Sequence, residues 1–272
     1  MSKRTLIVQQ IDVWKAYDDI QALRGLDLEI FRGETFGLVG PNGAGKTTAM
    51  KIIVGLLKMD KGFVKVGAFD IEESPYEYKK LIGYVPEIVS LPDYLTVEEF
   101  LTYVGKIRNV PVEVIRERKN FYLRIFDLEE RRDSLILSLS RGMKQKTAMA
   151  ASLINDPDLL VLDEPFFGID PAGQRKIKDL FDERVNAGKS IFISTHMLDT
   201  AERMCDRVAI IHKGRKIASG DMRNLIDLSK SGEDSTLEEI FLKFIEEKVE
   251  PDLEESLRKK KRRGIFSFRR SK

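Results

Sequence analysis

One short loop constrains the fold of this chain more than any other stretch. Residues 40–47 read Gly-Pro-Asn-Gly-Ala-Gly-Lys-Thr, which fits the pattern Gly-x-x-x-x-Gly-Lys-Ser/Thr. An apolar run at 36–39 precedes the loop, and residues 48–54 have the length and apolar content of a helix. A strand, a glycine-rich loop and the start of a helix are the context in which this pattern wraps phosphates. The sequence therefore predicts a nucleoside triphosphate site in an α/β fold.

The residues of this loop supply the groups that a triphosphate needs. Its glycines let the backbone adopt positive φ and approach the phosphates, so that successive N–H groups and a helix N-terminus face them. Lys46 adds a cation for the β- and γ-phosphates, and the hydroxyl of Thr47 is a ligand for Mg²⁺. The predicted nucleotide-binding residues here are Gly40, Pro41, Asn42, Gly43, Ala44, Gly45, Lys46, Thr47 and Thr48.

An acidic pair follows a second apolar run. Residues 159–162 are Leu-Leu-Val-Leu, as in a strand buried on both faces of a parallel sheet, and Asp163 and Glu164 come next. Ligands of open α/β sheets bind at the carboxyl ends of strands, so both acids are expected to face the phosphates. Asp163 suits Mg²⁺, and Glu164 suits a base that orients and deprotonates a water. A helix-capping acid pair in a turn is the alternative interpretation.

A hydroxyl and a glycine open another predicted helix upstream of that strand. Residues 139–143 read Leu-Ser-Arg-Gly-Met, and Ala and Met recur at helical spacing from 144 to 154. A helix N-terminus with such groups is an anion site, so Ser140 and Gly142 are candidates for a second set of contacts to the triphosphate. Taken alone, Ser140 is better explained as a plain N-cap.

These elements, in this order, resemble those of an ATP-binding-cassette (ABC) ATPase, specifically a single-domain subunit of the exporter kind. The matching segments are 40–48, the signature 139–143, 159–165 (Leu-Leu-Val-Leu-Asp-Glu-Pro), 168–171 (Gly-Ile-Asp-Pro) and 194–196 (Ser-Thr-His). The resemblance implies an α/β fold: a P-loop NTPase core with a mixed or parallel sheet, an N-terminal antiparallel β subdomain and an inserted helical subdomain.

Periodicity and charge divide the chain. Helical periods at 97–104 and 114–126 indicate a helical insert at about 88–150, inside an ABC ATPase domain that spans 1–225. A C-terminal helical extension at 226–256 and a basic tail at 257–272 follow.

The resemblance implies a site that two subunits share. ABC ATPases pair head to tail, so that ATP on one phosphate loop is sealed by the signature of the partner. Ser140 and Gly142 would then act in trans, with Asp170 at the dimer seam. His196, which follows an apolar strand, would hold the γ-phosphate and the attacking water. The implied catalytic set is Lys46, Glu164 and His196.

Two further roles follow from the resemblance. The family stacks an aromatic side chain on the adenine ring, which points to Tyr17, although packing explains Trp14 and Tyr17 as well. Glu87 stands where most relatives have a Gln that contacts Mg²⁺ and water, and a carboxylate is a good ligand for this hard ion. The expected metal ligands are Thr47, Asp163 and Glu87.

A helix is predicted in the C-terminal extension. Thr236 and Glu239 have the spacing of a capping box, in which each side chain bonds to the backbone N–H of the other residue. The apolar stripe behind it consists of Leu237, Ile240, Phe241, Phe244 and Ile245. We expect this helix to pack on the core or on the second subunit.

Charge is concentrated at the C-terminal end. Residues 257–272 hold nine Lys and Arg and no acid, which leaves −7 for the rest of a chain whose formal net charge is +2. With three apolar side chains interleaved, this tail is expected to contact anionic lipid; nucleic-acid binding and a solvated tail are the alternatives. The single cysteine excludes an internal disulfide, and no apolar run approaches the ~20 residues of a membrane span.

Two classes of function remain. In the first, which we favour, a homodimer that hydrolyses ATP with Mg²⁺ drives a separate transmembrane permease, for export, from the cytoplasmic face of the membrane. Residues 88–95 are the candidate contact for that permease, although buried packing explains them equally well. In the second class, the chain is a soluble regulatory or nucleic-acid- or ribosome-associated ABC ATPase.

Overall fold

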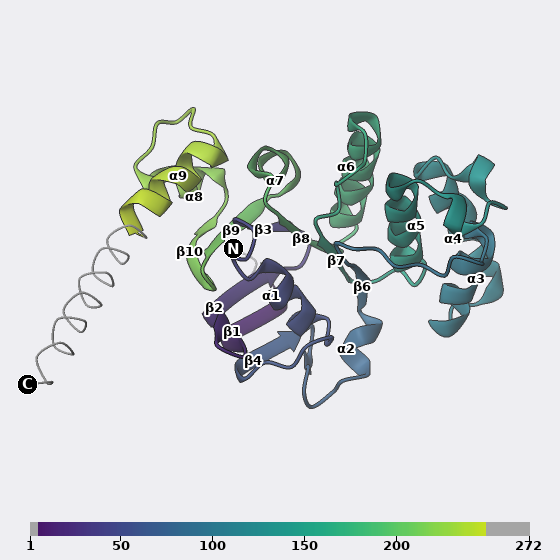
Figure 1. The fold of residues 1–272 in the computed structure, drawn as a ribbon, viewed down its shortest axis with the longest axis horizontal. Helices are drawn as coiled ribbons and strands as arrows, with labels where there is room; N and C mark the ends of the chain where they lie inside the picture. The colour runs from purple at the N-terminus through teal and green to yellow at the C-terminus, as the bar shows by residue number, and fades with distance from the viewer. Residues whose placement is uncertain (1–4, 249–272) are drawn as a thin grey trace, which may run out of the picture.

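A four-stranded antiparallel sheet opens the fold. The computed structural model describes residues 5–248 (Figure 1), and its first sheet has the strand order β2-β1-β4-β5. The strands are β1 (Leu6–Tyr17), β2 (Ile20–Phe31), β4 (Lys61–Val66) and β5 (Phe69–Asp70). Buried and exposed residues alternate along much of β2, as expected of a sheet with one covered face. The predicted N-terminal antiparallel subdomain is confirmed.

A second, six-stranded sheet forms the centre of the molecule, in the order β10-β9-β3-β8-β7-β6. Its strands are β3 (Thr35–Val39), β6 (Ile82–Val85), β7 (Leu159–Asp163), β8 (Ser190–Thr195), β9 (Arg207–His212) and β10 (Arg215–Gly220). All neighbours pair in parallel except β10, which runs antiparallel to β9. Every residue of β3, β7 and β8 is buried, as their unbroken apolar runs predict.

Two apolar clusters cover the faces of this central sheet. Side chains of β7 alternate between them: Leu160 and Leu162 belong to one, Leu159 and Val161 to the other. Helices α1 (Lys46–Ile53) and α6 (Pro171–Asn186) contribute to opposite clusters. The shorter helices around the core are α2 (Glu77–Lys80), α7 (Leu198–Met204) and α8 (Met222–Ser229).

The expected helical segment lies at one end of the molecule (Figure 1). It contains α3 (Val97–Ile107), α4 (Val112–Ile125) and α5 (Arg141–Leu153), with two 3₁₀ turns at Glu129–Arg131 and Ile136–Ser138. Thr96 and Glu99 form a capping box that fixes the start of α3. The helices fall inside residues 88–150 and just beyond, while the division of the chain into domains stays a prediction.

The C-terminal extension forms helix α9 (Leu237–Lys248) at the opposite end. The backbone N–H of Thr236 donates to Glu239 Oε2 over 3.0 Å, and that of Glu239 donates to Thr236 Oγ1 over 3.3 Å, so the predicted capping box is present. Leu237, Ile240 and Phe244 are buried in the chain's own core. Residues 249–256 of the expected extension, and the basic tail 257–272 with its expected lipid contact, lie outside the described residues. No helix within residues 5–248 has the length and apolarity to span a bilayer.

We predict that Phe192→Ala strongly lowers the stability of the fold. This β8 side chain is 0% exposed, and its ring centroid lies 5.9 Å from that of Phe36 on β3. Removing it leaves a cavity at the centre of the sheet and lowers the free energy of unfolding by about 3–5 kcal/mol. The same change at Phe121, which is 44% exposed on α4, is expected to cost about 1 kcal/mol. Urea unfolding checks both, and equal losses in the two variants would contradict this account of the core.

Candidate nucleotide site

The glycine-rich loop connects β3 to α1, as the sequence predicts. Gly45 is the N-cap of α1 with φ 110°, and a Cβ there would lie 2.7 Å from the carbonyl oxygen of Ala22. A Cβ on Gly40 would lie 2.2 Å from the carbonyl oxygen of Ile211. A larger residue at either position would push the loop away from the neighbouring strands, so these glycines allow the loop to sit close to β2 and β9.

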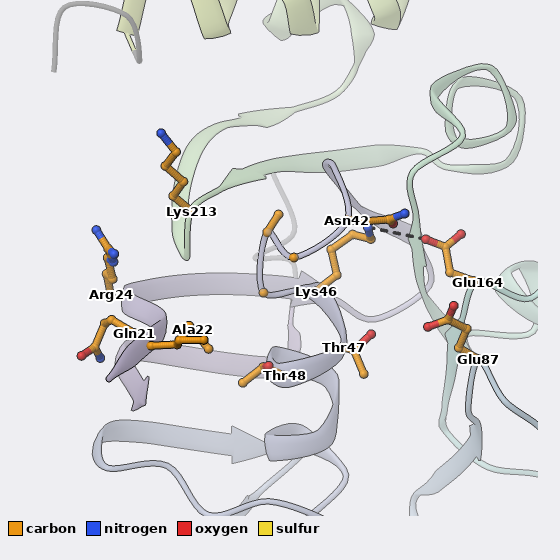
Figure 2. A pocket seen from close by; sticks show the side chains of 14 residues that line it. Gln21, Ala22, Arg24, Asn42, Lys46, Thr47, Thr48, Glu87, Glu164 and Lys213 are labelled. Atoms are coloured by element: carbon orange, nitrogen blue, oxygen red, sulfur yellow. Dashed lines mark ion pairs between the residues drawn. The ribbon is translucent and has the colours of Figure 1, made fainter. Parts of the chain in front are cut away.

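A cavity of about 610 Å³ lies over this loop and has the size of a nucleotide site (Figure 2). Of the residues that the sequence predicts, 42–48, Glu87 and Glu164 line it. The two acids stand at one end, beside Lys46 and Thr47 (Figure 2). The predicted phosphate-binding side chains are thus gathered at the end of the cavity that carries the carboxylates.

Glu164 is held between a lysine and a histidine. Its Oε1 lies 3.5 Å from Nζ of Lys46 and 2.9 Å from Nδ1 of His196, and it accepts a hydrogen bond from the backbone N–H of His196 over 3.0 Å. The carboxylate is 10% exposed. Glu164 also has φ 47°, an uncommon conformation for a residue with a side chain, in which the surrounding bonds must hold it.

Lys46 also forms hydrogen bonds with the loop that contains it. The ammonium group is 6% exposed and donates to the carbonyl oxygens of Gly40 over 2.8 Å and Pro41 over 3.3 Å. These are bonds to uncharged oxygens and to one carboxylate, so an anionic phosphate would compete well for the same group.

Asp163 is buried, and its two carboxylate oxygens differ in their hydrogen bonding. It is 0% exposed, its Oδ1 accepts from the hydroxyl of Ser194, and its Oδ2 has no hydrogen-bond partner within the described part of the chain. A buried polar atom without a partner calls for an explanation, and a cation that binds there would supply one.

The donor set around Asp163 fits Mg²⁺. Among residues 5–248, no three His, Cys, Asp or Glu side chains form a metal-binding group. Mg²⁺ does not need one, because it is bound by one or two carboxylates, with phosphate oxygens and waters completing its shell. Burial, followed by the charges of Asp163 and Glu87, raises the pKa of the neighbouring Tyr84 to about 12. Tyr84 therefore adds no negative charge beside the two acids at neutral pH.

His196 also borders a second, smaller cavity. This cavity has a volume of about 250 Å³, and residues 40–42 of the phosphate loop line it. Leu198 of α7 and Phe241 of α9 complete its lining. The histidine side chain is 44% exposed and does not line the larger cavity.

Besides Gly40, Pro41, Asp163 and His196, four predicted site residues do not line the nucleotide cavity of their own chain. Tyr17 is 44% exposed and pairs across the β1–β2 turn with Ile20, which does line it. The other three stand at helix starts away from the loop and are Ser140, Gly142 and Asp170.

These helix starts have the local bonds of capped N-termini. Ser140 accepts from the backbone N–H of Met143 over 3.3 Å, so the capping interpretation of this residue is confirmed. Asp170 accepts from the backbone N–H of Gly173 over 2.9 Å, and this bond lowers the pKa of the carboxyl group. Ser140 and Asp170 remain exposed at these helix starts.

No sequence pattern pointed to several residues at the other end of the cavity. They are Ile20, Gln21, Ala22 and Arg24 of β2, and Lys213 of the β9–β10 turn (Figure 2). The backbone N–H of Gly214 donates to the carbonyl of Ala44, and that of Arg24 donates to the carbonyl of Gly214, both over 2.9 Å. Lys213-Gly214 is recognisable as a turn, but its sequence position far from the loop does not reveal this contact.

Comparison with known proteins agrees with the geometry. The sequence model of the family described as ABC transporter matches residues 23–167, more than half of the chain. A Nod factor export ATP-binding protein I of Ralstonia nicotianae is 37% identical over 212 residues, which make up 78% of this chain and 66% of that protein.

Two solved structures are also similar. The first is an ATP-binding subunit of an ABC transporter, with a TM-score of 0.83, 31% identity, and coverage of 88% of this chain and 99% of the other. The second is a dimeric ATP-binding cassette in a post-hydrolysis state bound to ADP and Pi, with a TM-score of 0.72, 25% identity, and coverage of 79% and 99%. From its motifs, its fold and these relatives, the chain belongs to the ABC transporter family, as an ATP-binding subunit.

Proposed function

We propose that this chain binds and hydrolyses ATP and thereby drives a separate membrane permease. The observation that carries the proposal is the Glu164 carboxylate, held between Lys46 and His196 beside the phosphate loop. A carboxylate in that place can accept the proton of a water that attacks the γ-phosphate.

The proposed chemistry follows from the positions of these groups. The loop N–H groups and Lys46 bind the β- and γ-phosphates, and Lys46 exchanges part of its contact with Glu164 for phosphate oxygens. Glu164 takes a proton from a water whose oxygen bonds to the γ-phosphorus. The bond from that phosphorus to the β–γ bridging oxygen breaks, which yields ADP and phosphate. His196 holds the γ-phosphate and the water in line.

Thr47, Asp163 and Glu87 are the proposed holders of Mg²⁺, which when bound neutralises charge on the phosphates. The open Oδ2 of buried Asp163 supports this assignment. Tyr17 is the proposed platform for adenine, supported by its pairing with Ile20 at the edge of the cavity. A base stacked on an aromatic ring gains about 1–3 kcal/mol.

We propose that a second copy of the chain completes the site. Ser140 and Gly142 stand at the start of a capped helix outside their own cavity, where an N-terminus and a hydroxyl suit an anion. In a head-to-tail pair they would face the γ-phosphate on the other subunit, with Asp170 at the seam. The similar structure that is dimeric and bound to ADP and Pi supports this arrangement. ATP would close the pair, and hydrolysis would reopen it.

Two observations support the proposals of export and of a permease contact. The curated relative carries the name of an export ATP-binding protein. In the candidate contact 88–95, Ile88 is 79% and Tyr94 86% exposed, whereas Val89, Leu91 and Leu95 pack against the core. The exposed pair is available to a permease at the cytoplasmic face of the membrane. Contact of residues 257–272 with anionic lipid stays a prediction from their charge.

The role of Glu164 predicts a separation of binding from hydrolysis. Glu164→Gln keeps the shape of the side chain but removes the proton acceptor, so ATP hydrolysis should fall by about 100-fold or more. Affinity for ATP should change little, because the phosphate loop is intact. Phosphate release and ATP titration measure the two quantities, with Glu113→Gln on the exposed first turn of α4 as a control. Turnover near the level of the unmodified protein would show that another group is the base.

If two copies share the site, mixing two inactive variants should restore ATP hydrolysis. Asp and Asn both cap helices, so Ser140→Asp and Ser140→Asn keep the start of α5. Of the two, only Ser140→Asp places a carboxylate beside the partner's γ-phosphate. Its rate of hydrolysis should fall by about 100-fold, since such like-charge contacts cost several kcal/mol.

Mixing Ser140→Asp with Glu164→Gln tests the trans arrangement. One site of the mixed pair combines the intact loop and base of the first variant with the intact Ser140 of the second. We expect hydrolysis well above the sum of the separate variants. No gain on mixing, with each variant shown to bind ATP, would place Ser140 in its own chain's site or outside catalysis.

A further inference from the structure

We propose that Phe241 of α9 is a positioning residue for His196, an inference that rests on the proposed role of this histidine in hydrolysis. Phe241 belongs to the C-terminal extension, outside residues 23–167 that the sequence model of the family matches. It nonetheless lines the small cavity that His196 borders.

A buried apolar cluster joins α9 to both segments that flank the nucleotide site. Leu237, Ile240 and Phe244 of α9 are 0%, 0% and 1% exposed, and they share the cluster with Val39 and Ala201. Val39 is the last residue of β3, directly before the phosphate loop. Ala201 lies in α7, the helix that begins just after the histidine. The extension therefore packs on the supports of two catalytic segments at once.

A hydrogen bond fixes the position of α9 along α7. The backbone N–H of Leu237, in the first turn of α9, donates to Oε2 of Glu202 on α7 over 2.9 Å. The capping box of Thr236 and Glu239 holds the same turn. With its start bonded and one face buried, α9 presents Phe241 at a set position along α7.

Phe241 and Leu198 give the cavity beside His196 an apolar side. The remaining lining is the phosphate-loop segment 40–42 and the histidine itself. Phe241 is partly buried and packs against the apolar cluster that contains Leu237, Ile240 and Phe244 of α9. His196 is bonded to Glu164 through Nδ1 but remains 44% exposed, which leaves its ring room to turn unless neighbouring side chains limit it.

The proposed effect is on the orientation of the imidazole. Without the ring of Phe241 the cavity grows, and His196 would spend time in orientations that do not face the γ-phosphate. Catalysis is sensitive to displacements of about 1 Å in groups that position substrate. Nucleotide binding should be spared, because Phe241 lies outside the larger cavity that contains Lys46 and Thr47.

Kinetics test the proposal in the full-length chain. Phe241→Ala should lower kcat for ATP hydrolysis about tenfold while KM stays within about twofold, the pattern of a lost transition-state contact. Phe241→Leu, which keeps apolar bulk, should recover most of the rate. Leu242→Ala is the matched control, because Leu242 is the next residue of α9 and is 53% exposed. Unchanged kcat in Phe241→Ala, or an equal loss in Leu242→Ala, would overturn the proposal.

Imidazole NMR provides a readout that does not depend on hydrolysis. The chain has two histidines, so ¹H–¹⁵N spectra contain two ring systems, which His196→Gln assigns. Phe241→Ala should shift the His196 signals, through the lost ring current and the altered orientation, and leave those of His212 in place. Unchanged His196 signals would overturn the proposal even if kcat fell. If the unmodified chain did not hydrolyse ATP, the proposed function would fail by itself, and the spectra would still test whether Phe241 acts on the ring of His196.

Discussion

The contact of the Glu164 carboxylate with Lys46 and His196 is the interaction on which this site depends. It joins the end of β7 to the phosphate loop and to the residue after β8, three segments that are far apart in the sequence. A carboxylate that is 10% exposed has lost most of its contact with water, and here a cation, an imidazole and a backbone N–H contact it instead. The same bonds hold Glu164 at a positive φ, which by itself costs about 1–3 kcal/mol.

The central sheet makes this contact geometrically available. Parallel pairing sets Asp163 opposite Ser194 and Val39 opposite Thr195, so that the phosphate loop, the acidic pair and His196 all leave the sheet at one edge. Complete burial of β3, β7 and β8 fixes this register, since a slip by one residue would exchange the two faces of each strand. The extension helix α9 then packs behind two of the three segments. Packing far from the candidate nucleotide site thus bears on the placement of the groups proposed to act in catalysis.

The sequence predicts those parts of the site that are encoded locally. The phosphate loop, the strand before Asp163 and the capping box at Thr236 each depend on residues within a few positions of one another. The contact of Gly214 with Ala44, the hydrogen bond from Leu237 to Glu202, and the cavity that Phe241 and His196 both line arise from tertiary packing, which no local pattern specifies. Residues proposed to act in trans, such as Ser140, need a second copy before their geometry can appear.

The molar mass of Glu164→Gln in solution, with and without Mg-ATP, tests the central claim most directly. If Glu164 is the base of a site that two copies share, this variant should trap ATP between them and scatter light as a dimer with Mg-ATP and as a monomer without it. Adding Ser140→Asp to the same chain should abolish the dimer, because the signature would then repel the partner's γ-phosphate. A mass of one subunit under all conditions, with ATP shown to be bound, would contradict the shared site.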